Sequence, residues 1–173
     1  MVEIHDERLH AERNGEFVVF LVGMRINRLR NVHRWLPVAL SAPRMVEEQE
    51  QEGLLGSRFL RSGLREFTVL QYWESFEALR EYARDPDTEH RTWWSRFDRL
   101  ASEDDTVGIW HETYPVREGE YETVYRHMPV SGLGAVAGSE LVPATGPRES
   151  AAGRLGRTGE ADAPAVPDGG TER

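Results

Sequence analysis

The sequence predicts an α+β fold in which helices cover one face of an antiparallel sheet. Short runs of β-branched and aromatic residues alternate along the chain with stretches of helical periodicity. Two of the strand-like runs are separated only by a short turn, as in a hairpin. With 173 residues, 39% of them hydrophobic, the chain is long enough for one domain with a core of its own.

The first strand is expected at residues 16–26, an apolar run rich in β-branched and aromatic side chains. A helix is predicted over residues 33–52, because Trp35, Leu36, Ala39 and Leu40 form one stripe of a 3.6-residue period. Pro43 suits a first helical position, so this helix should break just before it. Gly53 then ends the second piece as a C-cap.

A β-hairpin is expected next, with strands at residues 54–60 and 65–73 around the turn 61–64. Alternation along the second strand defines its two faces. One face carries Phe67, Val69, Gln71 and Trp73, and the other carries Thr68, Leu70 and Tyr72.

Ser75 is a predicted N-cap for a helix over residues 76–84, and Asp85-Pro86 opens a further helix to about Leu100. Strands are expected at residues 106–116 and 121–127. The resulting order, β-α-β-β-α-β-β, is that of the ferredoxin-like arrangement. Helices can cover only one face of this sheet, yet its strands are apolar on both. We therefore expect a homodimer in which the open face packs against a second copy.

The composition changes sharply near Ala144. Residues 145–173 are rich in glycine, alanine, proline and charge, and they contain no aromatic side chain. Such a segment buries too little apolar surface to offset the entropy lost on ordering. The sequence predicts a folded domain over residues 1–144 and a disordered tail over residues 145–173.

Thirty acidic and 21 basic residues give a net charge of −9, and no dense basic patch suggests nucleic acid as a partner. The chain has no cysteine, and every basic residue is arginine, which excludes disulfides, thiolate metal sites and Schiff-base lysines. The longest apolar run, residues 17–24, is too short to cross a membrane. The acidic N-terminus does not have the pattern of a signal peptide, so a cytoplasmic location is predicted.

His111 lies in the most informative stretch, residues 107–115. On a strand it shares a face with Ile109 and Thr113, while Trp110, Glu112 and Tyr114 point the other way. An imidazole on a buried strand is a candidate general base or haem ligand. It is equally a candidate for a hydrogen-bonded core residue that helps to fix the sheet.

Arg25 and Asn27 share one face at the end of the first strand. An arginine at the mouth of an apolar cavity would orient a carboxylate or enolate, and the alternative is a strand-end salt bridge. His90 and Trp94, four residues apart, fall on one helical face and either border a pocket or belong to the core and its edge. The histidines have no spacing that indicates a shared metal ion, so no metal site is predicted.

Several segments resemble the monooxygenase-like family that includes the fumagillin-pathway polyketide monooxygenase. The resemblance covers about residues 16–143, and its most specific motif is W-H-E-T-Y at residues 110–114. The matching segments are FVVFLVGMRINR (17–28), HRWLPV (33–38), GLLG (53–56), YWESFEALREYARDPDTEHRTWWSRF (72–97), VGIWHETYPV (107–116) and YETVYRHMP (121–129).

The resemblance implies a dimeric α+β barrel, in which the sheets of two subunits form one barrel and a hydrophobic pocket lies between each sheet and its helices. Members of that superfamily include cofactor-free monooxygenases of antibiotic biosynthesis and haem-binding enzymes such as aldoxime dehydratases. The implied function is that of a monooxygenase-like oxidoreductase that oxidises a hydrophobic small molecule, a secondary metabolite, without metal or flavin.

In that mechanism His111 would be the base, and Arg25 with Asn27 would stabilise the substrate anion. The pocket would be walled by Tyr72, Trp94, Ile109 and Thr113. Two alternatives stay open. In the first, haem b is bound with His111 as its axial ligand and arginines pair with the propionates. In the second, the chain is a non-catalytic module that binds an apolar metabolite in the same pocket.

Overall fold

The computed structural model describes residues 3–41, 51–84 and 104–157. The chain divides into two compact units where the sequence predicts one domain over residues 1–144. We call residues 16–116 the sheet unit, and residues 1–15 together with 117–173 the terminal unit.

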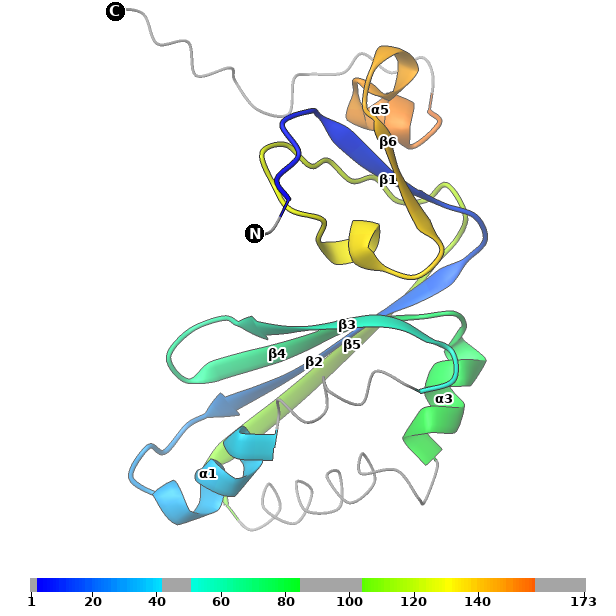
Figure 1. The fold of residues 1–173 in the computed structure, drawn as a ribbon. Helices are drawn as coiled ribbons and strands as arrows, with labels where there is room; N and C mark the ends of the chain where they lie inside the picture. Colours follow the sequence, from blue (N-terminus) through cyan, green and yellow to red (C-terminus); the bar gives the residue numbers. More distant parts are fainter. Residues whose placement is uncertain (1–2, 42–50, 85–103, 158–173) are drawn as a thin grey trace, which may run out of the picture. The chain divides into compact units, whose positions relative to one another are not determined.

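The sheet unit contains four antiparallel strands in the order β3-β4-β2-β5, which is the ferredoxin-like topology that the sequence predicts. Figure 1 shows the two described helices of this unit on the same side of the sheet. Of the predicted helical piece 43–52, residues 43–50 lie outside the described residues, and residues 51 and 52 are not helical. The predicted helix over residues 85–100 also lies outside the described residues. The elements are β2 (Phe17–Ile26), α1 (Val32–Ser41), β3 (Leu54–Arg61), β4 (Glu66–Trp73), α3 (Phe76–Arg84) and β5 (Val107–Val116).

Helix α3 begins and ends where its sequence pattern indicates. The hydroxyl of Ser75 accepts a hydrogen bond from the backbone N–H of Ala78 at 3.1 Å, as expected of an N-cap. Leu79 and Tyr82, on one face of the helix, are buried against β2 and β4. The rings of Tyr82 and Trp73 lie with centroids 5.0 Å apart, and Trp73 is completely buried. This contact fixes α3 on the helix-facing side of the sheet.

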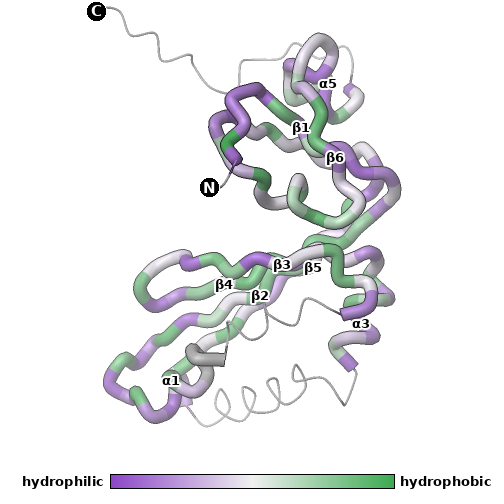
Figure 2. The backbone as a smooth tube through the Cα atoms, in the orientation of Figure 1, coloured by the Kyte–Doolittle hydropathy of each residue, from purple (hydrophilic) through white to green (hydrophobic). Residues whose placement is uncertain are grey.

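Apolar side chains lie on both faces of the sheet, and Figure 2 shows the hydrophobic residues along its strands. Toward the helices, the core consists of two clusters built around Val18, Phe20 and Trp73 and around Met24, Ile26 and Val107. The opposite face, called the open face here, carries half-buried apolar side chains that include Val19, Leu21, Leu70, Tyr72 and Trp110.

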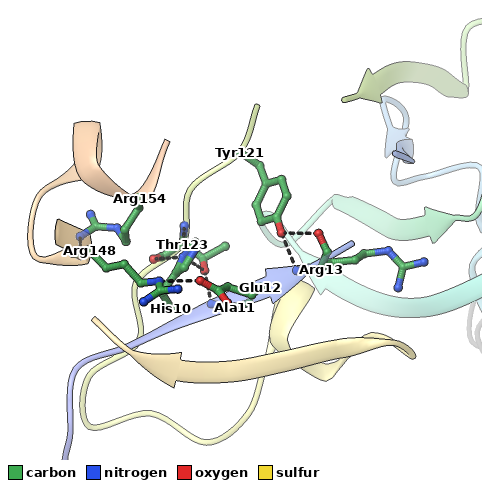
Figure 3. Close-up of polar contacts among 8 residues, drawn as sticks. All are labelled: His10, Ala11, Glu12, Arg13, Tyr121, Thr123, Arg148 and Arg154. Carbon is green, nitrogen blue, oxygen red and sulfur yellow. Dashed lines mark hydrogen bonds and ion pairs between the residues drawn. The ribbon is translucent and has the colours of Figure 1, made fainter. Parts of the chain in front are cut away.

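The terminal unit is built on β1 (Leu9–Arg13), which pairs antiparallel with β6 (Ser139–Pro143). The sequence predicts a strand over residues 121–127, and this prediction is wrong. Within that segment only Tyr125 forms a β-bridge, an isolated one with Leu9. Its side chains take the place of a strand ladder: Thr123 Oγ1 accepts from the N–H of Ala11 at 2.7 Å, and the Tyr121 hydroxyl accepts from the N–H of Arg13 at 2.6 Å (Figure 3).

Residues 145–157, predicted to belong to a disordered tail, form two short helices. These are η2 (Gly146–Arg148) and α5 (Ala151–Arg154), and a further 3-10 turn, η1 (Gly132–Ala135), precedes β6. Arg154 is only 7% exposed, and its Nε donates to Glu122 at 2.8 Å. Arg148 pairs with Glu12 at 2.5 Å (Figure 3). These ion pairs of Arg154 and Arg148 therefore hold in place a segment that composition alone assigns to the tail. Residues 158–173 lie outside the described residues.

None of the described helices is long and apolar enough to span a bilayer.

Packing of Trp110 on the open face is predicted to require a glycine at position 23. A Cβ at this position would lie 2.3 Å from the indole of Trp110, whereas one at Gly63 would meet nothing within 4 Å. Gly23→Ala should therefore displace Trp110 and lower the free energy of unfolding by about 1–3 kcal/mol, as overpacking does. Urea denaturation of both alanine variants tests this, and equal midpoints for the two would refute it.

Candidate functional site

His111 lies on the helix-facing side of the sheet. In the register of β2 and β5 it stands opposite Val22, and its ring centroid lies 5.9 Å from that of Phe20. Ile109, on the same face, packs against the cluster of Met24 and Ile26, which confirms the predicted alternation of β5. The side chain of His111 is exposed rather than buried, because β5 is an edge strand of the described sheet.

A row of side chains crosses the sheet beside His111. Directly paired residues of neighbouring strands share a face, and the pairs Ser57–Gln71, Gln71–Phe20 and Phe20–Thr113 connect all four strands. Gln71 is 2% exposed, and its Oε1 accepts a hydrogen bond from the indole N–H of Trp73 at 3.1 Å. Thr113, predicted to line a pocket, is half-buried in this row.

Arg25 lies on the open face, opposite the face that carries His111. It is paired with Glu66 on one side and Gly108 on the other, and its guanidinium lies 4.0 Å from the Glu66 carboxylate. The Arg25 side chain is 63% exposed. The structure thus does not bring Arg25 to His111, and the contact with Glu66 is the strand-end salt bridge of the alternative interpretation.

Asn27 follows the last residue of β2 and anchors the chain there. Its side-chain amide donates to the carbonyl of Asp105 at 3.0 Å, and its backbone N–H donates to the carbonyl of Thr106 at 2.9 Å. Thr106 is buried, and its own N–H donates to a carboxylate oxygen of Asp104 at 2.8 Å. These contacts hold the start of β5 against the end of β2.

The pKa of Asp104 is lowered, first by hydrogen bonds from the side chain and backbone of Thr106 and then by the nearby positive charge of Arg34, which outweigh the opposite effect of desolvation. Arg34, on α1, lies 2.9 Å from the Asp104 carboxylate. The charge of Asp104 therefore helps to connect α1 to β5.

Tyr72 also lies on the open face, with its ring centroid 6.3 Å from that of Phe17. The same face carries Tyr114, whose hydroxyl donates to Glu112 at 2.6 Å, and this hydrogen bond raises the pKa of Tyr114. Among the predicted site residues within the described part of the chain, only His111, Ile109 and Thr113 thus share a face. Trp94 and His90 lie outside the described residues.

The terminal unit contains a polar network that no sequence pattern predicts. His10 is 4% exposed, and its Nδ1 lies 3.1 Å from both the hydroxyl and the carbonyl oxygen of Thr123 (Figure 3). The ring of Tyr121 stacks on His10 with centroids 6.2 Å apart, and burial raises the pKa of Tyr121. These contacts join residues more than 100 positions apart, so no local pattern could reveal them.

The chain belongs to the monooxygenase af470-like family, whose model matches residues 17–133. The match covers all of the sheet unit except its first residue, together with part of the terminal unit. No curated protein matches the chain with a significant score.

Among solved structures, an aldoxime dehydratase is similar over 78% of this chain and 39% of its own length, with 19% sequence identity and a TM-score of 0.55. SnoaB, a cofactor-independent oxygenase from Streptomyces nogalater, is similar over 60% of this chain and 95% of its own, with 13% identity and a TM-score of 0.40. A dimeric protein of ferredoxin-like fold from Bacteroides fragilis is similar over 57% of this chain and 94% of its own, with 15% identity and a TM-score of 0.41. At these identities the likeness concerns the fold alone.

Asp104→Asn should lower the free energy of unfolding at neutral pH. This difference from wild type should disappear in acid. A carboxyl whose pKa is lower in the folded state than its ordinary value of 3.8 contributes stability above that value. The contribution disappears as the pH falls through the lowered pKa. Urea denaturation at pH 7 and at pH 3 measures this difference between wild type and variant. Asp105→Asn, at an exposed position, is the control, and a deficit for Asp104→Asn that persists unchanged in acid contradicts the assignment.

Proposed function

We propose that the chain is an oxidoreductase that oxidises a hydrophobic small molecule of secondary metabolism, with His111 as the general base. The observation that carries this proposal is the position of the imidazole on the helix-facing side of the sheet, beside Phe20, in a member of a monooxygenase-like family. Exposure of the side chain gives a substrate access to the base.

The proposed reaction starts with transfer of a proton from an acidic CH₂ group of a conjugated substrate to His111. The resulting carbanion donates electrons to O₂, and the CH₂ group becomes a carbonyl. One oxygen atom enters that carbonyl and the other leaves in water, so neither an external reductant nor a bound metal is needed for the balance. Ile109 and Thr113 would flank the reacting group, whereas Trp94, which the sequence predicts to line the same pocket, lies outside the described residues.

Stabilisation of the carbanion by Arg25 and Asn27 finds no support in the geometry. The Arg25 side chain belongs to the open face, and the amide of Asn27 is used to anchor residue 105. Tyr72 likewise belongs to the open face. In the present proposal the groups that stabilise the anion therefore lie on the helix-facing side, where His111 is.

We also propose that the open face of the sheet unit is the homodimer interface. Its half-buried apolar residues include Leu21 at the centre of β2, with Leu70 directly opposite on β4. Two sheets that meet through such faces would remove this apolar surface from water. The similar protein from Bacteroides fragilis is dimeric, which supports the proposal by analogy.

Haem is a second candidate because the fold resembles that of an aldoxime dehydratase. An exposed imidazole is a suitable axial ligand in a chain without cysteine, and a bound haem would supply redox chemistry at its iron. The fit is partial, since Val22, Ile109 and Thr113, the residues next to His111 on this face of β2 and β5, are uncharged and could not pair with propionates.

His111→Ala should reduce turnover about 10²–10⁴-fold, the usual contribution of a positioned general base. The measurement is oxygen uptake with a panel of polyketide phenols and their CH₂-acidic precursors. His127→Ala, an exposed histidine of the terminal unit, is the matched control and should leave the rate unchanged.

Unchanged turnover in His111→Ala would remove this residue from the mechanism. Binding of the panel without any oxygen uptake would instead support a non-catalytic module. A Soret band at one haem per subunit after haem is supplied, lost in His111→Ala and kept in His127→Ala, would replace cofactor-free oxidation by the haem alternative.

Leu21→Arg should convert the proposed dimer to a monomer, because it places a charge at the centre of the apolar interface. Sedimentation equilibrium gives the mass of each variant. Leu64→Arg is the control, because Leu64 is 83% exposed in the β3–β4 turn and its substitution should not change the mass. A monomeric wild-type protein would contradict the proposal.

A further inference from the structure

Gln71 has an amide group of which only one end is used. Its Oε1 accepts the indole N–H of Trp73, and since an N–H can be accepted only by oxygen, this contact fixes which way the amide points. The NH₂ end makes no hydrogen bond within the described part of the chain, although the residue is 2% exposed. The NH₂ end therefore keeps its two N–H donors available to a ligand or to water.

Ser57 carries a second unused group at the same place. Its hydroxyl oxygen is buried and has no hydrogen-bond partner among the described residues. Ser57 is the cross-strand partner of Gln71 on β3, so the two side chains stand next to each other on the helix-facing side. The unpartnered hydroxyl of Ser57 and the available donors of Gln71 thus lie side by side on one face of the sheet.

The chemistry of the pair determines what it can bind. The free end of Gln71 offers only donors, and the Ser57 hydroxyl can turn to donate as well. The surroundings are apolar, with Phe20 beside Gln71 on β2 and Val69 and Trp73 on either side along β4. A ligand that matches the pair is therefore mainly apolar and presents one oxygen acceptor.

We propose that Ser57 and Gln71 form a donor site for a carbonyl or enolate oxygen of the substrate. This inference rests on the proposed function, because it assigns a partner for the anion that removal of a proton by His111 would create. The row from Ser57 through Gln71 and Phe20 to Thr113 runs beside His111 on one face of the sheet. One ligand on this face would meet a base at the β5 end and donors at the β3–β4 end. Donors fixed before the reaction stabilise a developing oxyanion without reorganising.

The test compares two bicyclic probes with the same carbon skeleton, 1-tetralone, which has a carbonyl, and tetralin, which has none. Each is titrated into the full-length ¹⁵N-labelled protein while the side-chain amide of Gln71 and the indole N–H of Trp73 are followed by NMR. Wild type should bind 1-tetralone more tightly than tetralin, and the Gln71 amide should shift only with the ketone.

Ser57→Ala is the informative variant, because it removes a hydroxyl that has no partner within the described fold. It should keep or raise the melting temperature while weakening 1-tetralone binding about 2- to 10-fold, the usual effect of one hydrogen bond. Tetralin binding should not change. Gln71→Glu keeps an oxygen for the Trp73 N–H but loses the donors, so it should also weaken only the ketone.

Ser139→Ala is the matched control, since the Ser139 hydroxyl is also buried without a partner but belongs to the terminal unit. It should leave the affinity for both probes unchanged. If Ser57→Ala affects both probes equally, or if wild type binds them equally or binds neither, the donor site does not exist and the pair holds water or is only structural. Selective ketone binding without oxygen uptake by any substrate would leave the donor site in place and overturn only the oxidation.

Discussion

The sheet unit depends on the register of β2, which lies between β4 and β5 and sends alternate side chains to opposite faces. Phe20 points toward the helices and packs in one cluster with Trp73 of β4 and Tyr82 of α3, whereas Leu21 points to the open face. A shift of one residue would reverse both sets and expose the core, so burial on the helix-facing side fixes the register strongly. The positions of His111 opposite Val22 and of Gln71 opposite Phe20 follow from this one alignment.

The same alternation divides the polar side chains of the sheet into two groups. The helix-facing side carries the imidazole of His111, the unpartnered hydroxyl of Ser57 and the amide of Gln71. The open face carries Arg25, which contacts Glu66, and the hydrogen-bonded pair of Glu112 and Tyr114. Groups on opposite faces of one sheet cannot act on the same ligand from the same side. The proposed chemistry therefore belongs to the helix-facing side, and the proposed association of subunits belongs to the open face.

The terminal unit is stabilised in a different way. Its last described segment, residues 145–157, has few large apolar side chains and is held by charge-assisted hydrogen bonds instead. The guanidinium of Arg154 contacts the Glu122 carboxylate and also donates to the carbonyls of residues 148 and 149, at 3.0 and 2.9 Å. A buried arginine needs such a full set of partners, because each unpaired donor would keep the cost of leaving water.

Local sequence patterns predicted the secondary-structure elements and the two faces of the sheet, because strand alternation, helical periodicity and capping involve residues close together in the chain. The hairpin strands of residues 54–73, helix α3 with its Ser75 cap, and the shared face of His111, Ile109 and Thr113 were all predictable in this way. Tertiary structure alone decided the exposure of His111 on an edge strand, the separation of Arg25 from it, the contacts of Tyr121 and Thr123 with β1, and the ordering of residues 145–157. Each of these depends on partners far away in the chain, and no pattern within a window of residues contains that information.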